Sequence, residues 1–270
     1  MTISCTARKP ILVHIRDWID FQRSHMKIHG DTVFNLNDVD YVFGFVEEDS
    51  PLYGGRVRAG GSITRMDAYW CYDNDIGIKI PLSSKSFSDQ QYKDSREVLE
   101  QYHREGNAII ITNHKLAERL KNDYPKYKLE ASAIMAVDTK SKLDKVVGRK
   151  LYDHIVLPIA ANDDMKLLES IEDKEQIRLF INAECSYNCP SKVCYGTTGQ
   201  INSGKSDKMI CSHWDLKMPR TWYDNSVDWS SYYFDIGKFN DMGFSHYKMV
   251  TPEPLEQRTN IMVDTRYKNN

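Results

Sequence analysis

The stretch Ala108-Ile-Ile-Ile-Thr112 is followed directly by Asn113 and a helical pattern, and this unit decides the fold class. Its β-branched run predicts a strand that is buried on both faces, as the strands of parallel sheets are. Asn113 is a favourable N-cap residue, and the apolar residues after it recur at helical spacing until Pro125. The stretch therefore predicts one strand–helix unit of a parallel α/β protein.

The same alternation of apolar run and helical pattern recurs on both sides of this unit. Further strands are predicted at residues 11–14, 41–46, 76–80, 129–134, 154–158, 177–181 and 245–250. Eight strand candidates favour a (β/α)8 TIM-type barrel, with residues 1–270 forming a single domain. An open doubly wound α/β sheet is the alternative, because the sequence does not define several of the strand–helix boundaries sharply. Pro252 opens an expected C-terminal helix, and the tail after residue 266 is expected to fray.

Composition and charge limit the class of protein. The 270 residues are 41% hydrophobic and 27% charged, which is ordinary for a soluble globular chain. The formal net charge of −2 carries no signature of nucleic-acid binding. No apolar stretch approaches the roughly 18 residues of a membrane span, and no apolar signal segment is visible near Met1. We therefore expect a cytoplasmic protein that has no membrane partner.

Four of the six cysteines lie in one segment that follows the strand predicted at residues 177–181. They are Cys185, Cys189, Cys194 and Cys211. In a reducing compartment, clustered cysteines are metal ligands more often than disulfide partners. The segment also occupies the carboxyl end of a strand, which is where parallel barrels place their chemistry. The sequence therefore predicts a metal-binding loop at residues 182–215.

Two metal centres suit these thiolates. The spacing of the cysteines is looser than in zinc ribbons and departs from the run of bacterial ferredoxins. A [4Fe–4S] cluster is the favoured hypothesis, because its corners need ligands from well-separated directions and a wide, irregular set of cysteines is compatible with that. A structural zinc ion held by all four cysteines is the alternative, and unmetallated thiols are the third hypothesis. His213, two residues after Cys211, is a candidate to replace one cysteine as a ligand.

The run Asn182-Ala-Glu-Cys185-x-x-Asn-Cys189-Pro-x-Lys-x-Cys194-Tyr195, with the later Cys211, resembles the cysteine region of a family of bacterial and phage proteins related to the U32 collagenase-like peptidases. Tyr53-Gly-Gly-Arg56 also resembles a turn of that family. This chain departs from the family pattern at two positions: Lys192 stands where the family has arginine, and Cys194 stands near its histidine. An exchange of histidine for cysteine that keeps a metal ligand favours Cys194 as a true ligand.

The resemblance implies a TIM-type barrel with an iron–sulfur cluster at its mouth. It also implies an enzyme of redox or oxygen-independent hydroxylation chemistry, acting on a small-molecule or RNA-derived substrate. A peptidase is not supported by the residues, since neither a Ser/His/Asp pattern nor His-Glu-x-x-His is present. A non-catalytic binding module with a structural zinc is the alternative. A radical S-adenosylmethionine enzyme is a lesser one, since Cys185-x-x-x-Cys189 resembles only the start of that motif and lies too late in the chain.

Residues that follow the predicted strands are expected to face a pocket at the mouth. Glu184 is a candidate proton relay, and Lys192 is a candidate to offset cluster charge or contact an anionic substrate. Arg56, on a Gly-Gly turn, is a candidate to bind a carboxylate or phosphate. Asn113 and Asn182 are further candidate substrate contacts, although Asn113 also fits a purely structural role as a helix cap.

Overall fold

The computed structural model describes residues 1–9, 11–25, 27–28, 31–32, 34–53, 61–183, 186–187, 189, 191–202, 205–212, 215–216 and 233–250. Several predicted features lie outside the described residues. These are Arg56, Glu184, Cys185, His213, the C-terminal helix after Pro252 and the tail after residue 266.

Eight parallel strands close into a barrel, in the order β1-β10-β9-β8-β7-β6-β5-β4. The strands are β1 (Thr2–Thr6), β4 (Val39–Phe43), β5 (Gly77–Leu82), β6 (Ala108–Ile111), β7 (Lys128–Ala131), β8 (His154–Val156), β9 (Ile177–Phe180) and β10 (His246–Lys248). Every neighbouring pair is parallel, including the closing pair β1 and β10. The predicted (β/α)8 barrel is thereby confirmed, and the open sheet is excluded.

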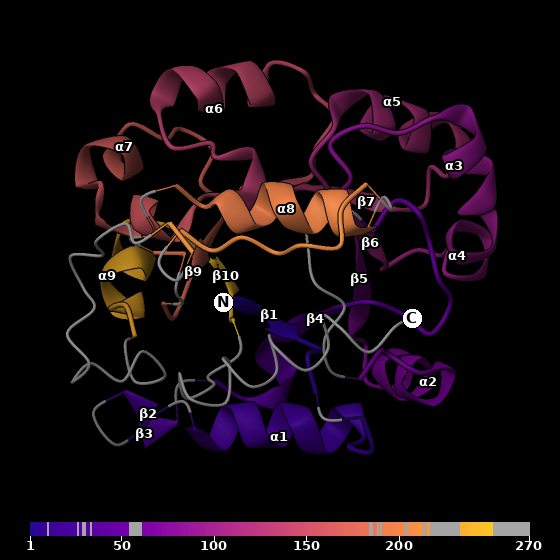
Figure 1. Cartoon of the computed structure of the whole chain (residues 1–270). Helices are drawn as coiled ribbons and strands as arrows, with labels where there is room; N and C mark the ends of the chain where they lie inside the picture. The colour runs from indigo at the N-terminus through magenta and orange to yellow at the C-terminus, as the bar shows by residue number, and fades with distance from the viewer. Residues whose placement is uncertain are drawn as a thin grey trace.

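Helices surround the barrel, one or more following most strands (Figure 1). They are α1 (Ile15–His25), α2 (Arg65–Asp73), α3 (Asp89–Asp94), α4 (Arg96–Gln101), α5 (His114–Asp123), α6 (Lys140–Val147), α7 (Met165–Glu169), α8 (Val193–Asn202) and α9 (Ile236–Asp241). Short pieces complete the described fold: the antiparallel pair β2 (Lys27–Ile28) and β3 (Asp31–Thr32), and the 3-10 turns η1 (Leu36–Asp38), η2 (Ala133–Met135) and η3 (Ile159–Asp163). No helix among the described residues is both long enough and apolar enough to cross a membrane.

The strand predicted at residues 11–14 is wrong. This segment forms a turn before α1, and the side chains of Ile11 and Leu12 are 76% and 98% exposed. The first strand of the barrel is β1 instead, whose Ile3 and Cys5 face outward into the apolar core. The alternate residues Thr2, Ser4 and Thr6 are polar, so β1 lacks the continuous apolar run that marks a strand buried on both faces.

Strand alternation divides the buried side chains into two environments. On β5, Ile78, Ile80 and Leu82 are fully buried in the apolar layer between the strands and the helices. Lys79, between two of these residues, is equally buried but points into the barrel, where it meets Glu130 of β7, two strands away. The molecule therefore has an apolar core outside the barrel and a polar one inside it.

Candidate functional site

The predicted metal loop begins at the carboxyl end of β9 and continues into α8, which lies inside the ring of the other helices in the view of Figure 1. Two parts of this loop are packed together. The Cys189 sulfur lies 3.0 Å from the hydroxyl oxygen of Ser212, the residue directly after Cys211. At a second point, the Thr197 hydroxyl on α8 is 3.4 Å from both the backbone nitrogen and the carbonyl oxygen of Ile210. The fold thus brings the segments of Cys189, Cys194 and Cys211 together.

The turn at Lys192 directs a backbone donor at one thiol. Lys192 adopts a left-handed conformation with φ of +49°, which is uncommon for a residue other than glycine. Its backbone N–H donates to the Cys189 sulfur at 3.3 Å. Hydrogen bonds of this kind stabilise a thiolate and tune a metal centre bound to it.

The chemistry of the donor set fits a soft metal centre. Cys189, Cys194 and Cys211 are each partly buried, and none of the described cysteines is in a disulfide. Within the described ranges, no three His, Cys, Asp or Glu side chains lie close enough to hold a metal ion. Cys185 and His213 fall outside those ranges. The structure therefore assembles the segments that carry the predicted ligands without presenting a complete ligand set.

Asn182 connects the segments that follow two neighbouring strands, β9 and β10. It is fully buried, its amide nitrogen donates to the Val250 carbonyl at 2.8 Å, and its amide oxygen accepts from the Val250 backbone N–H at 2.9 Å. The side chain thereby ties the residue after β9 to the end of β10 on the same barrel rim. Both the oxygen and the nitrogen of the side-chain amide bind backbone groups, so in this structure Asn182 has a structural role rather than the predicted role of a substrate contact.

Asn113 caps α5 at the same rim. Its side-chain oxygen accepts from the backbone N–H groups of Lys115 and Leu116 at 2.9 and 3.4 Å, and its amide nitrogen donates to the Lys85 carbonyl at 2.9 Å. Asn113→Ala should therefore lower the free energy of unfolding by about 1 kcal/mol, measured by urea denaturation. Asn113→Asp, which keeps the cap oxygen, should lose less. Equal losses in the two variants would contradict the capping role.

A charged layer that the sequence did not predict fills the barrel. Glu130 lies at its centre and pairs with Lys79, with Lys248 at 2.8 Å and with the Arg178 Nε at 3.6 Å. Arg178 also makes two hydrogen bonds to Asp40, at 2.6 and 3.1 Å. These side chains come from β4, β5, β7, β9 and β10, so they meet only through the barrel interior.

Mutual compensation keeps these buried groups charged. Burial alone would raise the pKa of the Glu130 carboxyl, but Lys248, Lys79 and Arg178 together hold that pKa well below its usual range. Burial, and then the neighbouring Arg178, lower the pKa of Lys79 to about 8, against the opposing effect of Glu130. The sequence signal for this charged layer was a charged residue between two apolar residues of a strand, as in Ile78-Lys79-Ile80.

Comparison with known proteins bears on the fold. No protein-family model matches the sequence, and no curated protein matches it. Among solved structures, that of a U32 peptidase is similar, with a TM-score of 0.59, 14% sequence identity and coverage of 94% of each chain. At this identity the similarity concerns the backbone arrangement. The chain therefore shares the closed (β/α)8 barrel fold of a U32 peptidase.

Proposed function

We propose that this chain is a U32-like barrel enzyme that holds an iron–sulfur cluster at the carboxyl end of its barrel. One observation carries the proposal: segments bearing three cysteines pack together directly after β9. Catalytic groups of β/α barrels gather at this end. The fold shared with a U32 peptidase supports the family assignment.

The proposed cluster ligands are Cys185, Cys189, Cys194 and Cys211. When bound, such a cluster supplies electron transfer. The chain's own contribution is to orient the thiolates and donate hydrogen bonds to them, as the Lys192 backbone does to Cys189. The side chain of Lys192, half-buried at the mouth, is proposed to offset negative charge on the cluster or to hold an anionic substrate.

The proposed reaction class is redox chemistry or oxygen-independent hydroxylation of a small-molecule or RNA-derived substrate. Peptide hydrolysis, taken from the description of the similar structure, is the competing assignment. The sequence lacks the His-Glu-x-x-His motif by which the common zinc peptidases hold their metal. The cysteine loop favours the first assignment, because thiolates at the mouth suit an iron–sulfur centre better than a hydrolytic site.

Metal identity tests the proposal directly. Protein purified without oxygen should be brown, absorb broadly in the visible range, and contain iron and acid-labile sulfide in equal amounts. Iron, sulfide and zinc should be measured on the same sample. Colourless protein with one zinc per chain would instead establish the structural zinc site and remove the redox assignment.

Cysteine variants should separate the cluster from the scaffold. We expect Cys189→Ser and Cys194→Ser to lose most of the iron and the visible absorption while remaining folded, because the strand ladder and the charged layer involve neither residue. Cys71→Ala is the control, since Cys71 is buried in the core on α2. It should keep the iron. Full iron content in Cys189→Ser would refute the ligand assignment, and collapse of thermal stability would indicate structural zinc.

A further inference from the structure

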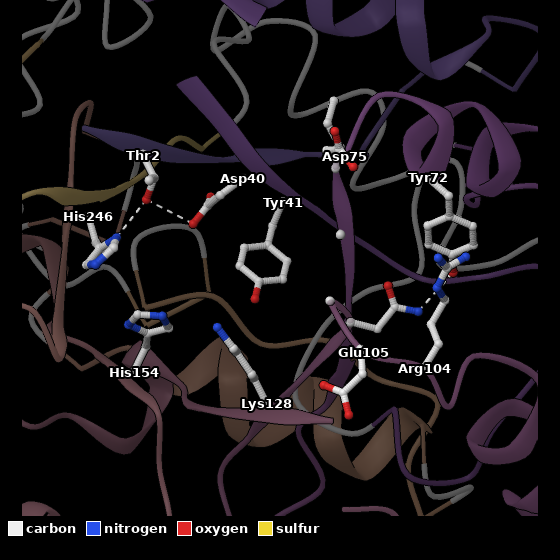
Figure 2. Close-up of a pocket in the computed structure, with 14 residues that line it drawn as sticks. Thr2, Asp40, Tyr41, Tyr72, Asp75, Arg104, Glu105, Lys128, His154 and His246 are labelled. Atoms are coloured by element: carbon white, nitrogen blue, oxygen red, sulfur yellow. Dashed lines mark hydrogen bonds between the residues drawn. The ribbon is translucent and has the colours of Figure 1, made fainter. Parts of the chain in front are cut away.

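A cavity of about 380 Å³, shown in Figure 2, opens at the amino ends of the barrel strands, whereas the cysteine loop begins at the carboxyl end of β9. Residues at the amino ends of the strands line it, among them Thr2, Asp40, Gly77, Lys128, His154 and His246. Its volume falls in the range of pockets that take small organic molecules. The cavity is therefore separate from the proposed active site, with the charged layer between the two.

Three polar groups converge on this cavity. Figure 2 shows the hydroxyl of Tyr41, the ammonium of Lys128 and the imidazole of His154 pointing toward the same space, from β4, β7 and β8. Among the residues that the structure describes, none provides a hydrogen bond to these three groups; Tyr41 is buried and His154 partly buried, whereas Lys128 is exposed. An arrangement of polar tips around one open volume is what a ligand site requires.

The neighbouring histidine shows the contrast. His246 lies against His154, with the ring centroids 4.8 Å apart. Its Nδ1 is 2.7 Å from the Thr2 hydroxyl oxygen, and its Nε2 is 3.1 Å from a carboxylate oxygen of Glu175. His246 is thus held by the fold at both nitrogens. The Nδ1 of His154 is buried with no hydrogen-bond partner in the described structure, which favours the tautomer that carries the proton on Nε2.

The electrostatic environment favours a negative ligand beside His154. Burial, followed by the charges of Arg178 and Lys79, lowers the pKa of His154 to about 3, so the imidazole is neutral near pH 7. The same positive field would attract an anion. Of the carboxylates that line the cavity, Asp40 is compensated by Arg178. The other two, Asp75 and Glu105, lie across the cavity from the histidines (Figure 2).

The donors also match an oxyanion. A neutral His154 that carries its proton on Nε2 avoids burying an unpaired N–H at Nδ1 and offers an N–H donor. The Tyr41 hydroxyl and the Lys128 ammonium add two further donors, one of them charged. Charge-assisted hydrogen bonds from such donors are strongest to carboxylate and phosphate oxygens.

We infer that this cavity binds a small organic anion, whose carboxylate or phosphate group is held by Tyr41, Lys128 and His154. Chemistry in β/α barrels is carried out at the carboxyl ends of the strands, so a ligand at the amino ends acts as an effector rather than as a substrate. The inference does not depend on the metal centre.

Titration calorimetry of the full chain with inorganic phosphate and with acetate at pH 7 tests the site. We expect one saturable site per chain for at least one of them, and the tighter anion identifies the headgroup. Lys128→Gln should weaken binding about tenfold or more, because it removes a charged hydrogen-bond donor. Lys126→Gln makes the same change in net charge at an exposed lysine outside the cavity lining, and it should leave affinity unchanged.

A second measurement reports on His154 itself. Bound anion should raise the pKa of His154, followed by NMR of the imidazole C–H signals and assigned with His154→Gln. Cys189→Ser should bind the anion as the wild type does, which separates this site from the metal loop. Absence of saturable binding by both anions, or equal weakening in Lys128→Gln and Lys126→Gln, would overturn the inference.

Discussion

Glu130→Gln should lower the free energy of unfolding by about 3–5 kcal/mol, the cost of breaking a buried ionic network by removing one partner. The carboxylate is 1% exposed and is the shared partner of Lys79 and Lys248, with Arg178 close by. Glutamine has nearly the same volume, so the loss does not come from a cavity. It comes from buried cations that are left without a counter-charge.

Urea denaturation at neutral pH measures the effect, with Glu118→Gln as the matched control. Glu118 is 54% exposed and lies 4.0 Å from Arg149, so its replacement should change stability by about 0.5 kcal/mol or less. The folded pKa of Glu130 lies below its unfolded value, so its contribution is present above the unfolded pKa and is lost as pH falls through the folded pKa. The difference in the free energy of unfolding between the wild type and Glu130→Gln should therefore become smaller at acid pH. Equal losses of stability in Glu130→Gln and Glu118→Gln near pH 7 would contradict the stabilising role of the buried ionic network.

Gly77→Ala should destabilise the barrel by about 3 kcal/mol or more, the upper range for overpacking a core. A Cβ at this position would lie 2.0 Å from the Gly106 carbonyl oxygen and 2.7 Å from a ring carbon of Tyr41. A backbone oxygen cannot rotate away as a side chain can. Relief would require β5 to move relative to the loop before β6.

Gly196→Ala is the control for this substitution. Gly196 lies within α8, and a Cβ there would meet no heavy atom within 4 Å. Alanine should be neutral or stabilising there by about 0.5–1 kcal/mol, since it removes the entropic cost of glycine in a helix. If both variants lose the same stability in urea, steric exclusion at Gly77 is not the cause.

Local signals made most of the barrel predictable. Asn113 was predicted as a cap because a capping side chain acts within three residues, and it accepts backbone hydrogen bonds in the structure. The run Ala108–Ile111 needed no tertiary information. The first strand failed for the opposite reason: the exposed Ile11 and Leu12 carry the stronger apolar signal, whereas β1 becomes a strand only through its neighbours in the barrel.

For the candidate site, residue type alone carried the prediction of a metal loop. Clustered cysteines indicate a metal whatever the fold, so that hypothesis needed no contacts, and it stays a prediction. The charged layer depends on closure, which brings Glu130 to Lys79 across 51 residues and to Lys248 across 118. A lysine inside an apolar strand pattern is typical of a solvated face. Only the closed barrel turns that face inward.

The closing pair β1 and β10 has a consequence for how the protein is made. Thr2 pairs with His246, and β10 has only three residues. A ribosome releases β1 long before this partner exists, so the nascent chain carries open sheet edges that can recruit other chains. Pairing between residues this far apart in the sequence raises the contact order, and a high contact order slows folding. The yield of soluble protein should thus depend on how well the unfinished barrel is protected from aggregation until its last strand has been made.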